Sequence, residues 1–201
     1  MSFLSGLVLG LAMILPIGPQ NVFVLTQGLE GRLGRGLLAA LVAGLCDTLL
    51  ILAGAAGLSA LFTAVPWLRL VLLLTGVAFL LGLGLAWLRA PAAPEPVAPA
   101  GGSTLSLLAT GVAVSWGNPH AILDTVAVLG SAVAAQLPAA RVPFAAGAIS
   151  ASWLFFLTLA LAGSLLGRFV TPGAQRWIRR SSGVMMLTFA IILGREALRL
   201  L

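Results

Sequence analysis

Long apolar stretches follow one another along almost the whole chain. They cover roughly 3–28, 37–62, 66–89, 104–134, 143–168 and 177–200 of the 201 residues, and a helix needs about 20 mostly apolar residues to cross a bilayer. Hydrophobic residues make up 60% of the chain and charged residues only 8%, whereas roughly a quarter of a soluble domain is charged. The sequence therefore predicts an all-α integral membrane protein with six transmembrane helices.

A segment from 90 to 103 divides the chain near its middle. It contains "APAAPEPVAPAGG" (Ala90 to Gly102), which has the composition of a linker. The halves on either side, 1–89 and 104–201, share short motifs in the same order, such as "LVAGLCD" and "FAAGAIS". Because three spans per half reverse the direction in which the second half enters the membrane, we expect two inverted three-helix repeats. Chance similarity between apolar segments is the alternative explanation.

The arginines are distributed unevenly over the predicted loops. One side of the membrane would carry Arg32, Arg35, Arg89, Arg168, Arg176, Arg179 and Arg180, and the other Arg69, Arg141, Arg195 and Arg199. Cytoplasmic loops of membrane proteins carry an excess of basic residues. We therefore expect the first set in the cytoplasm and both termini outside it, and we expect no nucleic-acid partner because this basic excess reflects topology.

The motif "LPIGPQN" interrupts the first apolar stretch with residues that disfavour a helix. Proline removes a backbone donor and glycine lets the chain unwind, so Pro16, Gly18 and Pro19 predict a helix break. Irregular backbone at membrane depth is tolerated only where it is buried in protein or faces water. Gln20 and Asn21 follow directly and become candidate binding residues, with an ordinary proline kink as the alternative.

A second break is predicted in "WGNPH", at Asn118 and Pro119. His120, Asp124 and Ser131 follow at spacings of four and seven, which places them on one face of an α-helix. A carboxylate in hydrocarbon is costly unless it is paired or hydrated, so we expect Asp124 to face the interior of the bundle. A locally paired acid at a helix end and a structural histidine are the alternatives.

Asp47 is the second acid inside a predicted span, about ten residues into the second stretch. It shares a helix face with Ala40, Gly44 and Gly54, and small residues let another helix approach closely. The arginines of the predicted stretches lie near the stretch ends, so we expect no basic residue inside the membrane to neutralise Asp47 or Asp124. Two such acids predict a site for a cation, whether a substrate, a proton or a metal ion.

Enzymatic and metal-binding functions are disfavoured. The single cysteine, Cys46, and the single histidine, His120, provide no cluster of soft ligands, so we expect no metal site and no cofactor. Ser115, His120 and Asp124 have the residue types of a hydrolase triad, but the serine lacks a Gly-x-Ser-x-Gly context. We therefore expect no catalytic residues.

The two break motifs resemble the signatures of the LysE family of amino-acid exporters. The first similarity covers "MILPIGPQNVFVLTQG" (Met13 to Gly28) and the second covers "NPHAILDTVAVLGS" (Asn118 to Ser131). "AGAISASWLFF" (Ala146 to Phe156) and "PWL" (Pro66 to Leu68) also match the pattern of the arginine exporters in that family. The resemblance runs through all six predicted spans.

This resemblance implies export of L-arginine, and of L-lysine as a further candidate, across the bacterial inner membrane. The implied substrate and proton site comprises Gln20, Asn21, Asp47, Asn118, His120 and Asp124, with Pro16, Gly18, Pro19 and Pro119 as helix-break residues. An exporter of neutral amino acids or of another small cation, and a non-transporting membrane scaffold, remain as alternatives. Membrane lipid is an expected partner, and a homo-oligomer is left open.

Overall fold

The structure is a computed structural model. It describes residues 2–16, 18–30, 33–58, 65–89, 103–117, 122, 124–167, 169 and 171–199, and these residues form helices and their connections, with no strand among them. The helical elements are α1 (Ser2–Ile14), α2 (Pro19–Glu30), α3 (Leu33–Ala53), η1 (Gly54–Leu58), α5 (Pro66–Arg89), α6 (Thr104–Trp116), η2 (Asp124–Leu129), α8 (Gly130–Ala134), α9 (Pro138–Gly167) and α10 (Pro172–Leu198).

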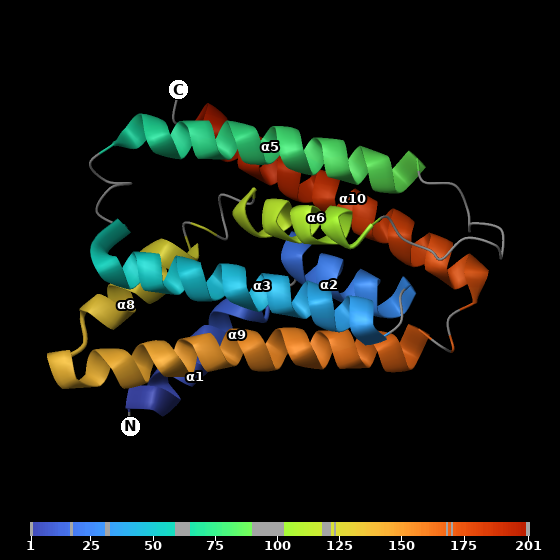
Figure 1. The fold of residues 1–201 in the computed structure, drawn as a ribbon. Helices are drawn as coiled ribbons and strands as arrows, with labels where there is room; N and C mark the ends of the chain where they lie inside the picture. The colour runs from blue at the N-terminus through green and yellow to red at the C-terminus, as the bar shows by residue number, and fades with distance from the viewer. Residues whose placement is uncertain are drawn as a thin grey trace.

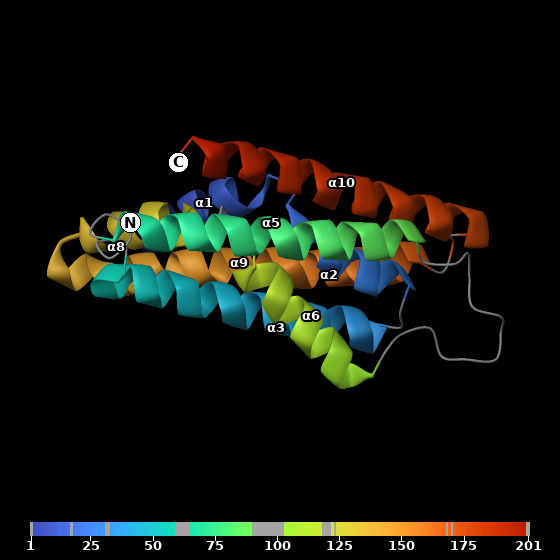
Figure 2. The ribbon, with the colours of Figure 1, turned by 90° about the horizontal axis from the view of Figure 1, so that it is seen from above.

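The long helices lie side by side in one bundle (Figure 1). Helix α9 packs against α1, α2 and α3, while α5 and α10 pack against each other. Both ends of the chain lie at the same end of the bundle, on the left in Figures 1 and 2, whereas α5 ends and α6 begins at the opposite end. Helix α9 is therefore the common support for the first three helices of the chain.

Several elements have the length and composition of membrane spans. Leu33–Gly57, Pro138–Gly167 and Arg180–Leu198 are each long and apolar enough to cross a bilayer, and the bent pair α1 and α2 together makes a fourth. The shorter apolar stretches Leu73–Arg89 and Thr104–Trp116 are also helical. The expected all-helical membrane fold is confirmed, while the expected set of six spans stays a prediction.

The structure has a helix break in the first stretch, at the proline-containing motif. Helix α1 ends at Ile14 and α2 begins at Pro19, and the two helices meet at 82°. Proline suits the first position of α2 because its missing N–H would have no partner inside the helix. The side chain of Asn21 bridges the break, since its Nδ2 donates to the carbonyl oxygens of Ile14 (3.0 Å) and Pro16 (3.1 Å).

The fourth predicted stretch is also interrupted near the expected place. Helix α6 ends at Trp116 with Gly117 as its C-cap, and the next helical element, η2, begins at Asp124. This second segment is π-helical from Asp124 to Leu129. A π-helix winds more loosely than an α-helix, so the expected α-helical stripe does not hold here, and the Ser131 side chain is exposed.

Glycines allow α1 to lie directly on α9. A Cβ added at Gly6 would clash with the carbonyl oxygen of Phe144, and one at Gly147 would clash with the carbonyl oxygen of Phe3. Small residues at facing positions let membrane helices pack backbone to backbone, where van der Waals contact stabilises the pair. The glycines of both helices therefore hold the N-terminal segment against the central helix.

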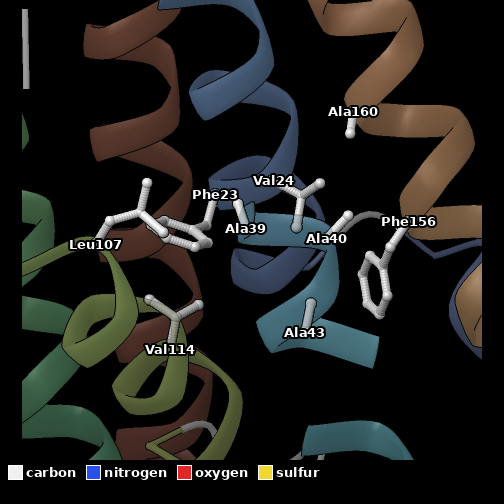
Figure 3. Close-up of a cluster of buried hydrophobic side chains, with 9 residues drawn as sticks. All are labelled: Phe23, Val24, Ala39, Ala40, Ala43, Leu107, Val114, Phe156 and Ala160. Carbon is white, nitrogen blue, oxygen red and sulfur yellow. The ribbon is translucent and has the colours of Figure 1, made fainter. Parts of the chain in front are cut away.

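The largest buried cluster joins four helices in the middle of the bundle. Side chains from α2, α3, α6 and α9 converge there (Figure 3). Its buried members are Phe23, Val24, Ala39, Ala40, Ala43, Leu107, Val114, Phe156 and Ala160. The small residues of α3 make room for the two phenylalanines, so the helix that carries Asp47 is enclosed along this part of its length.

We expect Gly147→Ala to destabilise the protein. The added methyl group would meet the α1 backbone, and overpacking of this kind costs about 1–3 kcal/mol. Gly82→Ala is the matched control, because a Cβ at Gly82 would meet no described atom within 4 Å. Thermal unfolding of the purified protein in detergent should show a lower melting temperature for the first variant only. Equal melting temperatures would contradict the close α1–α9 contact.

We also expect Asn21→Ala to weaken the fold around the break. The carbonyl groups of Ile14 and Pro16 would lose the Asn21 amide as a partner, and the loss of one such hydrogen bond costs about 0.5–1.5 kcal/mol. Gln136→Ala is the control, because the Gln136 side chain donates to Ala132 beside an exposed turn. Limited proteolysis should cut the Asn21 variant near the break more readily than the wild type, and an unchanged pattern would refute the bridging role.

Candidate functional site

Asp47 lies in the interior of the bundle and accepts hydrogen bonds from two other helices. Its side chain is 8% exposed. Gln20 Nε2 of α2 donates to Asp47 Oδ1 over 3.0 Å, and Ser152 Oγ of α9 donates to Asp47 Oδ2 over 2.9 Å. Both donors are neutral, so among the described contacts the carboxylate has hydrogen-bond partners but no opposite charge.

Apolar layers enclose this polar group from both ends of the bundle. On one side lies the cluster of Figure 3, which includes Ala43 of α3 and Phe156 of α9. On the other side, Ile51 of α3 packs with Leu129 and with Ala148 of α9. Asp47 and Ser152 lie between these residues on their helices, so the carboxylate is closed off from both ends.

Gln20 connects the carboxylate to the broken first span. It is the second residue of α2, and its Nε2 also donates to the carbonyl oxygen of Ala43 over 3.3 Å. A Cβ placed at Gly18 would meet no described atom within 4 Å, so there is open space beside the start of this helix. The N-terminus of a helix attracts anions through its free N–H groups and its dipole. The site therefore combines a carboxylate with a nearby helix start.

The close approach expected on the Asp47 face of α3 is present. A Cβ at Gly44 would lie 3.0 Å from the indole ring of Trp153, and the Trp153 Nε1 donates to Thr48 Oγ1 over 3.1 Å. Farther along, a Cβ at Gly54 would lie 2.9 Å from the Cα of Gly130 in α8. Gly44 of α3 thus brings α9 close to the Asp47 face, and Gly54 at the start of η1 brings α8 close to the end of the same helix.

The predicted residues of the second motif are described only in part. Asn118, Pro119 and His120 lie outside the described residues, and of Asp124 only the backbone is described, at the start of η2. Its neighbours Ile122 and Val126 pack in one cluster with Leu50 of α3. The segment that carries Asp124 therefore runs beside α3 about one turn from Asp47.

The remaining candidates of the first motif have separate roles in this structure. Gln20 joins Asp47, whereas the Asn21 amide turns to the break and bonds the backbone there. Pro16, Gly18 and Pro19 form the break itself. Gln20 and Asp47 are thus the pair of predicted residues that the structure brings into contact.

Ser152 is the site residue that the sequence analysis did not identify. A serine in an apolar helix is usually a residue that bonds its own backbone, and nothing in "AGAISASWLFF" distinguishes Ser152 from Ser150. Only the position of α9 against α3 shows which of the two faces the carboxylate. In the described part of the chain, no group of three or more histidine, cysteine, aspartate or glutamate side chains could hold a metal ion.

Comparison with known proteins gives the relationships of the whole chain. Residues 11–197 match the family model for the LysE type translocator. An "Arginine exporter protein ArgO" of Yersinia enterocolitica is 41% identical over 98% of both chains. A protein of the same name from Salmonella schwarzengrund is 42% identical over 96% of this chain and 93% of its own length. Another from an Enterobacter species is 41% identical over 98% of this chain and 94% of its own length. No solved structure gives a significant match.

The match covers both break motifs and the helices that carry Gln20, Asp47 and Ser152. It agrees with the all-helical, membrane-spanning architecture. The chain is therefore a multi-pass membrane protein that belongs to the LysE family of translocators.

Proposed function

We propose that this protein exports L-arginine from the cytoplasm across the bacterial inner membrane, with L-lysine as a second candidate substrate and protons as the exchanged ion. Family membership makes it a transporter rather than an enzyme, and the similar full-length proteins are named arginine exporters. The single observation that carries the choice of a cationic substrate is the buried Asp47 carboxylate, whose partners among the described residues are the neutral donors Gln20 and Ser152.

The charge of arginine requires an energy source. Its guanidinium stays protonated at physiological pH, and moving one positive charge outward against an inside-negative potential costs about 2.3 kcal/mol per 100 mV. Facilitated diffusion would therefore favour import. Exchange for one proton removes this net charge movement, and a carboxylate that binds arginine and a proton in turn would couple the two fluxes. We assign this exchange to Asp47 or Asp124, with the other acid binding the remaining cationic group of the substrate.

The backbone at the helix breaks provides partners for the α-carboxylate of the substrate. We place this group at the start of α2, where the first N–H groups of the helix and the space beside Gly18 are available. The corresponding region of the second half would contribute Asn118, Pro119 and His120. This arrangement would hold the two ends of the amino acid by opposite charges.

The two apolar layers around Asp47 correspond to the two gates that alternating access requires. Opening the cluster of Figure 3 would expose the site to one end of the bundle, and separating Ile51 from Leu129 would expose it to the other. The arrangement in which both layers are packed would then be an occluded one. A rocking motion of one half against the other would open each layer in turn.

An inverted repeat is supported by the course of the chain. The first half starts at the end of the bundle where the second half finishes (Figure 1), and the corresponding helices α3 and α9, and α5 and α10, pack as pairs. We propose that 1–89 and 104–201 are the two repeats, joined by 90–103. The excess of arginine at the end near Arg35 and Arg89 supports an orientation with that end in the cytoplasm and both termini outside.

Replacing Asp47 by asparagine is expected to abolish arginine export without preventing membrane insertion. The asparagine keeps the size of the side chain and can still accept a hydrogen bond from Gln20 or Ser152, but it has no charge with which to bind a cation or a proton. Efflux of labelled arginine from preloaded proteoliposomes, with the pH gradient and the potential imposed separately, measures this. Asp124→Asn should behave alike, and Glu196→Gln is the control.

Wild-type efflux by both Asn variants would exclude the two carboxylates as the charge site. Absence of arginine movement in the wild type, with insertion verified, would favour a neutral substrate.

The proposed orientation can be tested by labelling in intact cells. In a Cys46→Ala background, Ser2→Cys and Arg199→Cys should react with a membrane-impermeant maleimide, since both termini are expected outside. Gly34→Cys, at the opposite end of the bundle, should react only after the cells are permeabilised. The reverse pattern would place the arginine-rich end outside and contradict the orientation.

A further inference from the structure

Ser152 differs from most hydroxyl-bearing residues of the described helices in the direction of its hydrogen bond. The hydroxyls of Thr26, Ser115 and Ser150 each donate to the carbonyl oxygen four residues earlier in their own helix. Ser152 Oγ instead crosses to α3 and donates to Asp47 Oδ2. Its side chain is 4% exposed, so this bond is formed in the protein interior, where water does not compete for it.

The two donors to Asp47 lie in helices that differ in length and in their surroundings. Ser152 lies in the middle of α9, a continuous helix of 30 residues against which α1, α2 and α3 pack. Gln20 lies in the first turn of a helix that starts directly after a break. Short segments next to breaks absorb conformational change more readily than the centre of a packed helix. Ser152 is therefore the fixed donor of the pair.

Gln20 can also leave the carboxylate without losing all its partners. The same Nε2 donates to the carbonyl oxygen of Ala43, and that bond does not depend on Asp47. A cation that takes the place of Gln20 at Oδ1 would thus leave the amide nitrogen with one hydrogen bond. If Ser152 kept its bond to Oδ2, the carboxylate would stay oriented with Oδ1 toward the start of α2 throughout the exchange.

We propose that Ser152 is a positioning residue for substrate binding, whose hydroxyl orients the Asp47 carboxylate so that Oδ1 faces the start of α2, where the substrate is proposed to bind. This inference rests on the proposed export of arginine. A group held in its productive orientation before binding avoids the entropy cost of ordering it. Loss of the hydroxyl should therefore weaken arginine binding more than it slows the transport step.

The test is the dependence of efflux on internal arginine concentration in proteoliposomes. Ser152→Ala should raise the half-saturating concentration about tenfold, the size expected for losing one hydrogen bond to a charged group, while the maximal rate changes by less than about twofold. Ser152→Thr keeps the hydroxyl and should restore the wild-type value. Ser152→Cys keeps the approximate size with a weak donor, and it should resemble Ser152→Ala. Ser150→Ala is the matched control on the same helix.

Each result separates the inference from its alternatives. A wild-type half-saturating concentration in Ser152→Ala would overturn it while leaving arginine export intact, and so would full recovery by Ser152→Cys, which would show a packing role. A loss in Ser152→Thr as large as that in Ser152→Ala would also overturn it. If the wild type moved no arginine, the proposed function would fail first and the inference with it.

Discussion

The hydrogen-bonded carboxylate of Asp47 is the constraint on which the site depends. An ionisable group inside a membrane protein is stable only with partners, and here the partners come from α2 and α9. Three segments distant in sequence must therefore meet at one point. Neither of these partners carries a charge, and this is the observation on which the proposed cation site rests.

Close packing of backbones makes this meeting possible. Gly6 and Gly147 allow α1 to contact α9, and Gly44 gives room to Trp153 beside the site. In a bilayer, helix association relies on such contacts because lipid is as apolar as the side chains. The irregular backbone at the first break is in turn bonded by Asn21, as backbone without helical hydrogen bonds requires at membrane depth.

Much of the architecture follows from local features of the sequence. The length of an apolar stretch predicts a helix, and the predicted stretch 66–89 agrees with α5. Its bounds were predictable because a proline precedes the run of apolar residues and an arginine ends it. Pro16, Gly18 and Pro19 predict the first break, because loss of a donor and added backbone freedom act within one turn. The fifth predicted stretch corresponds to α9, which starts at Pro138 and not at the predicted 143. Pro138 is the first residue of this helix, a position where proline is tolerated.

The sequence by itself determined the all-helical membrane class and the two interrupted stretches, and it singled out Asp47 and Gln20 as candidates, since these depend on composition and short-range chemistry. Only the tertiary structure decided that Ser152 rather than Ser150 binds Asp47, that Asn21 bonds the break, and that 124–129 is π-helical. The choice between the two serines depends on how α9 lies against α3, which is set by contacts between residues far apart in sequence, such as Asp47 and Ser152, 105 positions apart. The Asn21 bonds span only seven and five positions, but they depend on the angle at which α1 and α2 meet.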